Sequence, residues 1–246
     1  MYSISFRNSV PSSPMGFAFV ASLACALFSI GCGGSKTPVP AASIEAGDPA
    51  VTATASDTNS DTSKPAESVP IRKVAVVDPI VLIQTSAGDI KLQLFLQKSP
   101  QTVDNFLRNY VNRGFYEQTI VHHVDKGSLL AAGGYTADLQ PKTTRAPIFN
   151  EAANGLKNTR GTISMARDPA VAHSATSQFF LNVADNEGLD FVGNENDADF
   201  GYCVFGQVVE GMEIIDRISQ LAVAAQGDFP AVPQEAVVIH SVKQLK

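Results

Sequence analysis

Short apolar segments that alternate with polar residues constrain this chain more than any other feature of its sequence. Ile90, Leu92, Leu94 and Leu96 recur at every second position, which is the period of a β-strand with one buried face. A Gly-containing connection joins them to the apolar run 80–83, and this predicts a β-hairpin. Further strands are predicted in four apolar segments: 162–165, 179–183, 202–208 and 236–242.

Two other segments carry helical spacing. The first begins near Pro100, stops at Gly114 and places five apolar residues on one face: Val103, Phe106, Leu107, Tyr110 and Val111. The second, 211–221, turns three apolar residues inward: Met212, Ile215 and Ile218. Because the helices do not alternate regularly with the strands, the pattern favours a closed or sandwiched sheet with helical plugs over a parallel βαβ sheet.

Residues 1–31 are predicted to be a signal peptide. The apolar stretch 17–30 is too short to cross about 30 Å of hydrocarbon as a helix. It ends in Gly31-Cys32, which resembles a bacterial lipobox, although Ser29 stands where Leu is usual. We therefore expect a lipid on Cys32, which would anchor the protein in a membrane of the periplasm or cell envelope. The alternative is ordinary signal-peptide cleavage and a soluble secreted product.

Residues 32–75 predict a disordered tether. They are rich in Ala, Ser, Thr and Pro and contain almost no large apolar side chain. Such a segment cannot bury enough surface to offset the entropy of ordering. The folded domain is therefore expected to span 79–246, with Cys203 as its one thiol. A single thiol cannot form an intrachain disulfide, and its apolar neighbours predict a buried strand cysteine.

Charge and motifs exclude several function classes. The net charge of −6 and the absence of a Lys/Arg cluster disfavour nucleic acid as a partner. No phosphate-binding Gly loop, nucleophile elbow or zinc-ligand spacing is present. His122 and His123 are adjacent, so on a strand they would point to opposite faces and could not share a metal. Ser128 and His122 lie near each other in sequence, but this does not define a catalytic triad. A peptide or neutral ligand is the better expectation.

The motif Ser164-Met165-Ala166-Arg167, with the run 174–182 that follows, resembles the most characteristic stretch of the cyclophilins, particularly their periplasmic bacterial branch. Other cyclophilin-like motifs occur in the same order: 115–116, 133–134, 150–151, 158–162, 200–202 and 204–211. The resemblance covers about 79–246. It implies a mostly β fold, a closed eight-stranded antiparallel barrel with two capping helices. It also implies a monomeric peptidyl-prolyl cis-trans isomerase that needs no cofactor or metal and acts on unfolded or extended proline-containing polypeptides.

Isomerisation rotates an Xaa-Pro bond over a barrier of about 18–20 kcal/mol. The resemblance implies an apolar proline pocket, an Arg that donates to the proline nitrogen, and an amide that holds the flanking peptide. The residues that match this site are Phe180 on the pocket floor, Gln178 as the amide, Leu189 in the pocket, Ala166 and Arg167 on the main-chain segment, and Tyr202 at the rim. Phe179 and Phe180 alternate on one strand, so one of them is expected to belong to the core.

The same site departs from the family pattern at five positions. His123 stands where the family has its catalytic Arg. The other four replacements are Ser128 for a pocket Phe, Leu129 for Met, Ala131 for Gln, and Gly188 for a large rim residue. Losing one transition-state donor costs about 2.7–4 kcal/mol, so we expect weak isomerase activity unless Arg167 supplies a donor from the other wall. The alternative is a non-catalytic module that binds proline peptides or acts as a chaperone.

Overall fold

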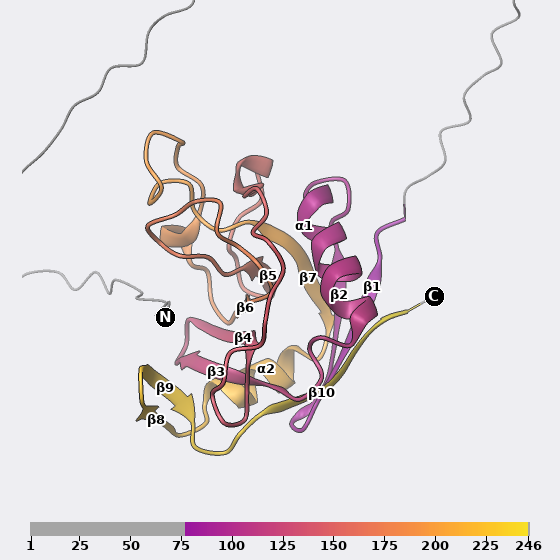
Figure 1. Cartoon of the computed structure of the whole chain (residues 1–246), viewed down its shortest axis with the longest axis vertical. Helices are drawn as coiled ribbons and strands as arrows, with labels where there is room; N and C mark the ends of the chain where they lie inside the picture. Colours follow the sequence, from indigo (N-terminus) through magenta and orange to yellow (C-terminus); the bar gives the residue numbers. More distant parts are fainter. Residues whose placement is uncertain (1–76, 246) are drawn as a thin grey trace, which may run out of the picture. The chain divides into compact units, whose positions relative to one another are not determined.

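Eight strands close into an antiparallel barrel in the computed structural model, which describes residues 77–245 (Figure 1). The order around the barrel is β1-β10-β3-β4-β6-β5-β7-β2. The bounds are β1 Ile80–Thr85, β2 Gly88–Leu94, β3 Thr119–Asp125, β4 Leu129–Thr136, β5 Thr162–Met165, β6 Phe179–Asn182, β7 Val204–Glu210 and β10 Val238–Leu245. The fold class predicted from the sequence is therefore confirmed.

The predicted hairpin is β1 and β2. Ile83 pairs with Ile90, and both side chains are buried, as the alternation requires. Gly88, at the turn, has a φ of 135°, a conformation that a residue with a Cβ rarely adopts. A separate two-stranded sheet, β8 Val223–Gln226 and β9 Phe229–Pro233, packs against β3. No prediction had been made for this second hairpin.

The first predicted helix has three consecutive parts. It begins as α1 (Pro100–Asp104), continues as the π-helical η1 (Asn105–Tyr110) and ends as the 3-10 turn η2 (Val111–Arg113). Gly114 follows with a φ of 63° and ends it, as predicted. All five residues predicted for its inner face are buried.

The second predicted helix is α2 (Met212–Ser219), which packs against β2, β3 and β4 through Ile215 and Ile218. Two short 3-10 turns complete the helical segments: η3 (Ala152–Asn154) and η4 (Glu187–Leu189).

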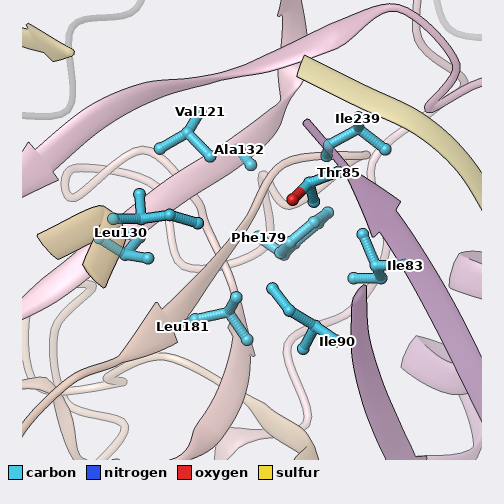
Figure 2. Close-up of a pocket in the computed structure, with 10 residues that line it drawn as sticks. Ile83, Thr85, Ile90, Val121, Leu130, Ala132, Phe179, Leu181 and Ile239 are labelled. Carbon is cyan, nitrogen blue, oxygen red and sulfur yellow. The ribbon is translucent and has the colours of Figure 1, made fainter. Parts of the chain in front are cut away.

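The barrel interior is a packed core and not a ligand chamber. Figure 2 shows apolar side chains from opposite walls pointing toward one another around a cavity of about 20 Å³, among them Ile83, Leu130 and Phe179. That volume holds about one water molecule. A binding site for anything larger must therefore lie outside the barrel.

The predicted signal peptide (1–31), the predicted tether (32–75) and the expected lipidation site Cys32 lie outside the described residues. Within 77–245, no helix is long and apolar enough to span a bilayer.

Candidate functional site

A second apolar cluster lies apart from the barrel core. Phe179 packs in the core against Phe106 and Tyr116, whereas Phe180, the next residue on β6, belongs to this other cluster. The alternation predicted for the two phenylalanines is thus observed. The cluster contains five buried residues and one that is partly buried: Leu129, Ala131, Ala166, Phe180, Tyr202 and, at its edge, Leu189. All six are residues that the sequence assigned to the candidate site.

Strand register places His123 on the same surface. His123 on β3 pairs with Ala131 on β4, which pairs with Phe180 on β6. Directly paired residues of antiparallel strands present their side chains on one face, and adjacent strands are about 4.8 Å apart. His123 therefore lies two strands, or about 10 Å, from Phe180 along the sheet, in the same row.

The His123 side chain is half-buried, and its electrostatics differ from those of an arginine. Burial lowers the pKa of His123 below its ordinary value, and the nearby charge of Asp125 only partly opposes this. At neutral pH the imidazole is therefore uncharged and has one N–H donor. A guanidinium at this position would carry a permanent charge and five donors.

Arg167 donates four hydrogen bonds to the protein's own backbone. Its buried guanidinium lies 4.7 Å from the Tyr202 ring centroid and donates hydrogen bonds to carbonyl oxygens of two loops. The acceptors are Gly201 (2.8 Å), Asp168 (2.9 Å), Pro169 (3.2 Å) and Asp197 (2.8 Å). These four bonds use most of its donors, so the geometry does not favour Arg167 as the substitute donor considered from the sequence for an arginine at position 123.

Ser128, which the sequence resemblance matches to a pocket Phe, makes a polar contact with Asn186. Ser128 Oγ donates to Asn186 Oδ1 at 3.0 Å, and Asn186 Nδ2 donates back to the Ser128 carbonyl at 3.1 Å. Gly188 provides no side chain at the adjacent rim, and the position is open, since a Cβ placed there would meet nothing within 4 Å. Asn186 escaped the sequence prediction because its partner is 58 residues away.

Gln178 borders the cluster immediately before β6. Its carbonyl accepts a hydrogen bond from the Ala166 amide at 2.9 Å, which ties the two segments together. Its side chain packs so closely on Gly134 that a Cβ there would lie 2.5 Å from Gln178 Cγ. Gln178 Oε1 is buried and accepts no hydrogen bond from any described residue. Burial raises the pKa of the neighbouring Tyr135, and its contact with the Gln178 side chain partly offsets this.

These features define a class of protein: a barrel with a sealed interior and a second apolar cluster, which reaches the surface at Leu189 and lies beside main-chain and amide groups that suit an extended peptide. The chain belongs to the cyclophilin family. Residues 80–244 match the family described as cyclophilin type peptidyl-prolyl cis-trans isomerase/CLD.

Named bacterial isomerases are close in sequence. The chain is 51% identical over 166 residues to peptidyl-prolyl cis-trans isomerase A of Dickeya dadantii, covering 68% of this chain and 84% of that protein. It is 48% identical over 163 residues to peptidyl-prolyl cis-trans isomerase B of Escherichia coli, covering 66% of this chain and 98% of that protein. Both support the activity class that the sequence resemblance implied.

The fold is shared with a solved Cryptosporidium parvum cyclophilin type isomerase, whose crystal structure was determined in the presence of the dipeptide Ala-Pro. The match has a TM-score of 0.54 at 23% identity and covers 68% of this chain and 99% of the other.

Proposed function

We propose that this protein is a cell-envelope isomerase that binds Xaa-Pro segments on the Phe180 cluster and catalyses their rotation slowly, because His123 replaces the family's arginine. One observation carries the proposal. The strand pairing His123–Ala131–Phe180 aligns the changed donor position with the Phe180 cluster, the candidate proline site.

Binding and catalysis make different demands on this surface. A proline ring needs apolar contact, which the partly buried Leu189 offers at the edge of the cluster that contains the buried Phe180 and Leu129. Only interactions that strengthen as the amide twists accelerate the reaction. A neutral imidazole is a weaker and shorter donor than a guanidinium, and the loss of one such donor corresponds to about 100- to 1000-fold in rate. The arrangement therefore supports proline binding better than it supports turnover.

Isomerisation measured by exchange NMR or a protease-coupled assay tests the proposal, with spontaneous rotation over tens of seconds as background. We expect His123→Arg to raise the rate by at least about 100-fold. The upper limit is about 1000-fold, the largest loss in rate expected from removing one transition-state donor. Adding Ser128→Phe and Ala131→Gln should raise it further and non-additively, because all three residues face one substrate. The control is His240→Arg, an exposed histidine on β10.

A wild-type rate that His123→Arg does not improve would show that the site is not disabled and would overturn the proposed mechanism.

A non-catalytic module that binds proline peptides or acts as a chaperone is the second candidate. The cluster keeps Phe180, Leu189 and Tyr202 while a histidine stands at the position of the charged donor, and this favours the non-catalytic module. It predicts peptide binding with no rate above background in the wild type.

We also propose that Cys32 carries a lipid that holds the domain at the membrane. The support is the short apolar stretch that ends in Gly31-Cys32. Mass spectrometry of the protein extracted from membranes is expected to show an acylated Cys32 at the N-terminus. An unmodified terminus, or retention of residues 1–31, would rule the anchor out.

A further inference from the structure

Four aromatic rings lie together on the surface formed by two loops and the segment before η3. We call them the aromatic patch: Phe149, His173, Phe191 and Phe200. Phe149 stacks on His173 at 4.1 Å between centroids, and Phe200 meets His173 edge-on at 4.9 Å and Phe191 at 5.5 Å. Phe149 is 53% exposed, and Val171 and Val192, which flank the patch along the chain, are 47% and 79% exposed. Clustered exposed apolar residues of this kind mark interaction surfaces.

The patch is held in place by buried and part-buried hydrogen bonds. Asn150 joins two of its parts, because its amide N–H donates to His173 Nδ1 at 3.2 Å and its side chain donates to the Gly201 carbonyl at 3.0 Å. The same carbonyl accepts from Arg167, which also binds the Asp197 carbonyl. These bonds fix the two loops in advance, so a ligand would meet an ordered surface and lose less entropy in binding it.

The patch is continuous with the candidate proline site. Phe200 and Tyr202 are separated by one residue, so their Cα atoms are at most about 7 Å apart, or about two residues of extended peptide. Tyr202 meets Phe180 edge-on at 5.5 Å. A segment whose proline lies on Phe180 would therefore reach the patch with a side chain about two to four residues away.

The loops around the patch are strongly acidic. From Asp168 to Phe200 the sequence contains seven acidic residues and no Lys or Arg, and the cation directly before this range, Arg167, interacts with the charges of Asp168 and Asp197. Within the described part of the chain, the ion pair of this region is Lys157–Asp190 at 3.4 Å. The remaining carboxylates favour a partner that carries positive charge.

We propose that the aromatic patch is a second contact for the bound polypeptide and selects extended segments that place an aromatic side chain, together with Lys or Arg, two to four residues from the proline. This inference rests on the proposed function and specifies its substrate class. The aromatic side chain would stack against Phe149 and Phe200, while the basic residue would face the carboxylates of the loops.

Fluorescence anisotropy with labelled nine-residue peptides tests this inference. Each peptide has one central proline, and a Phe or Lys is moved through the positions on either side, with Ser and Gln as the neutral replacements. We expect Phe at the favoured position to strengthen binding about two- to tenfold, the range for an aromatic contact. Lys should strengthen binding at low salt and lose its effect at high salt.

The matched variants are Phe149→Ser and, as a control, Val209→Ser, which changes a residue 45% exposed that is not part of the patch. Phe149→Ser should abolish the preference for Phe and leave binding of the Ser-containing proline peptide unchanged. Equal binding of Phe and Ser peptides by the wild type, or a preference for Phe that survives Phe149→Ser, would overturn the proposed role of the aromatic patch. Neither result would contradict the proposed proline site. Failure of every proline peptide to bind would overturn both proposals.

Discussion

Acid sensitivity of the fold follows from the position of His122. This side chain is 2% exposed and packs edge-on against Tyr135 at 4.8 Å and Phe229 at 6.0 Å. Its Nδ1 is buried and has no hydrogen-bond partner among the described residues. Burial is the main cause that lowers the pKa of His122 to about 3. The neighbouring His123 lowers the pKa further, and a hydrogen bond with the Ile120 backbone partly opposes the shift.

The sign and size of the effect follow from linkage. The unfolded chain takes up the proton at about pH 6.5 and the folded domain only near pH 3, so acidification through this window favours unfolding. The stability contribution is complete above about pH 6.5. Lowering the pH from about 7.5 to about 4.5 should remove about 3 kcal/mol, a large fraction of the 5–15 kcal/mol typical of a domain. His123 contributes in the same direction because burial lowers its pKa as well.

Urea unfolding followed by far-UV circular dichroism measures this, since the chain has no Trp. The free energy of unfolding should fall steadily between pH 6.5 and 4.5. In His122→Leu most of that fall should disappear, while His240→Gln, at an exposed position, should retain it. A pH dependence that is identical in the wild type and His122→Leu would refute the reasoning.

Three further predictions concern the loops and the thiol. Arg167→Met should cost about 3 kcal/mol in urea unfolding, because the part-buried Asp168, Pro169 and Asp197 carbonyls lose a charged donor. Arg167→Lys should recover only part because an ammonium lacks the planar fork; a neutral Arg167→Met would contradict this. Gly201→Ala should lower the free energy of unfolding by more than about 2 kcal/mol, because Gly201 has a φ of 64° and the new Cβ would lie 2.5 Å from the Asp190 carbonyl oxygen. The control Gly188→Ala should change it by no more than about 0.5 kcal/mol. Equal melting temperatures for the two variants would refute the difference. Burial raises the pKa of Cys203 to about 11, so iodoacetamide at about pH 8 should label it only after unfolding, and stoichiometric labelling of the folded protein would show the thiol to be accessible.

Much of the fold was predictable because its signals are local. Alternation along 90–96 and the helical spacing that ends at Gly114 depend on neighbours within a few residues. The structure reproduces the alternation as far as Leu94, where β2 ends, and the helical spacing in full. The π-helical turn of η1 was not predictable, since the same apolar spacing fits an uninterrupted α-helix. The β8–β9 hairpin gave little signal because its strands are short and one of them contains Pro230 and Pro233.

The candidate site was partly predictable, through its resemblance to the cyclophilins. That resemblance identified Phe180 and His123, and strand register places them in one row. It did not reveal that the Arg167 guanidinium fastens two loops, because the acceptors are main-chain carbonyls that have no sequence signature. The aromatic patch was missed for a related reason: Phe149 and Phe200 lie 51 positions apart, and only the folded loops bring them together.

Closure of the barrel has a consequence for folding kinetics. β1 completes the barrel by pairing with β10, so Ile80 finds its partner at Leu245, nearly the whole length of the domain away. Contacts of such long range form slowly because a large loop must close before they contribute stability. Until β10 docks, β1 and β3 each keep an open edge with unpaired backbone groups, which is the feature that leads partly folded chains to aggregate. The last strand to dock therefore sets how long the newly made domain stays vulnerable.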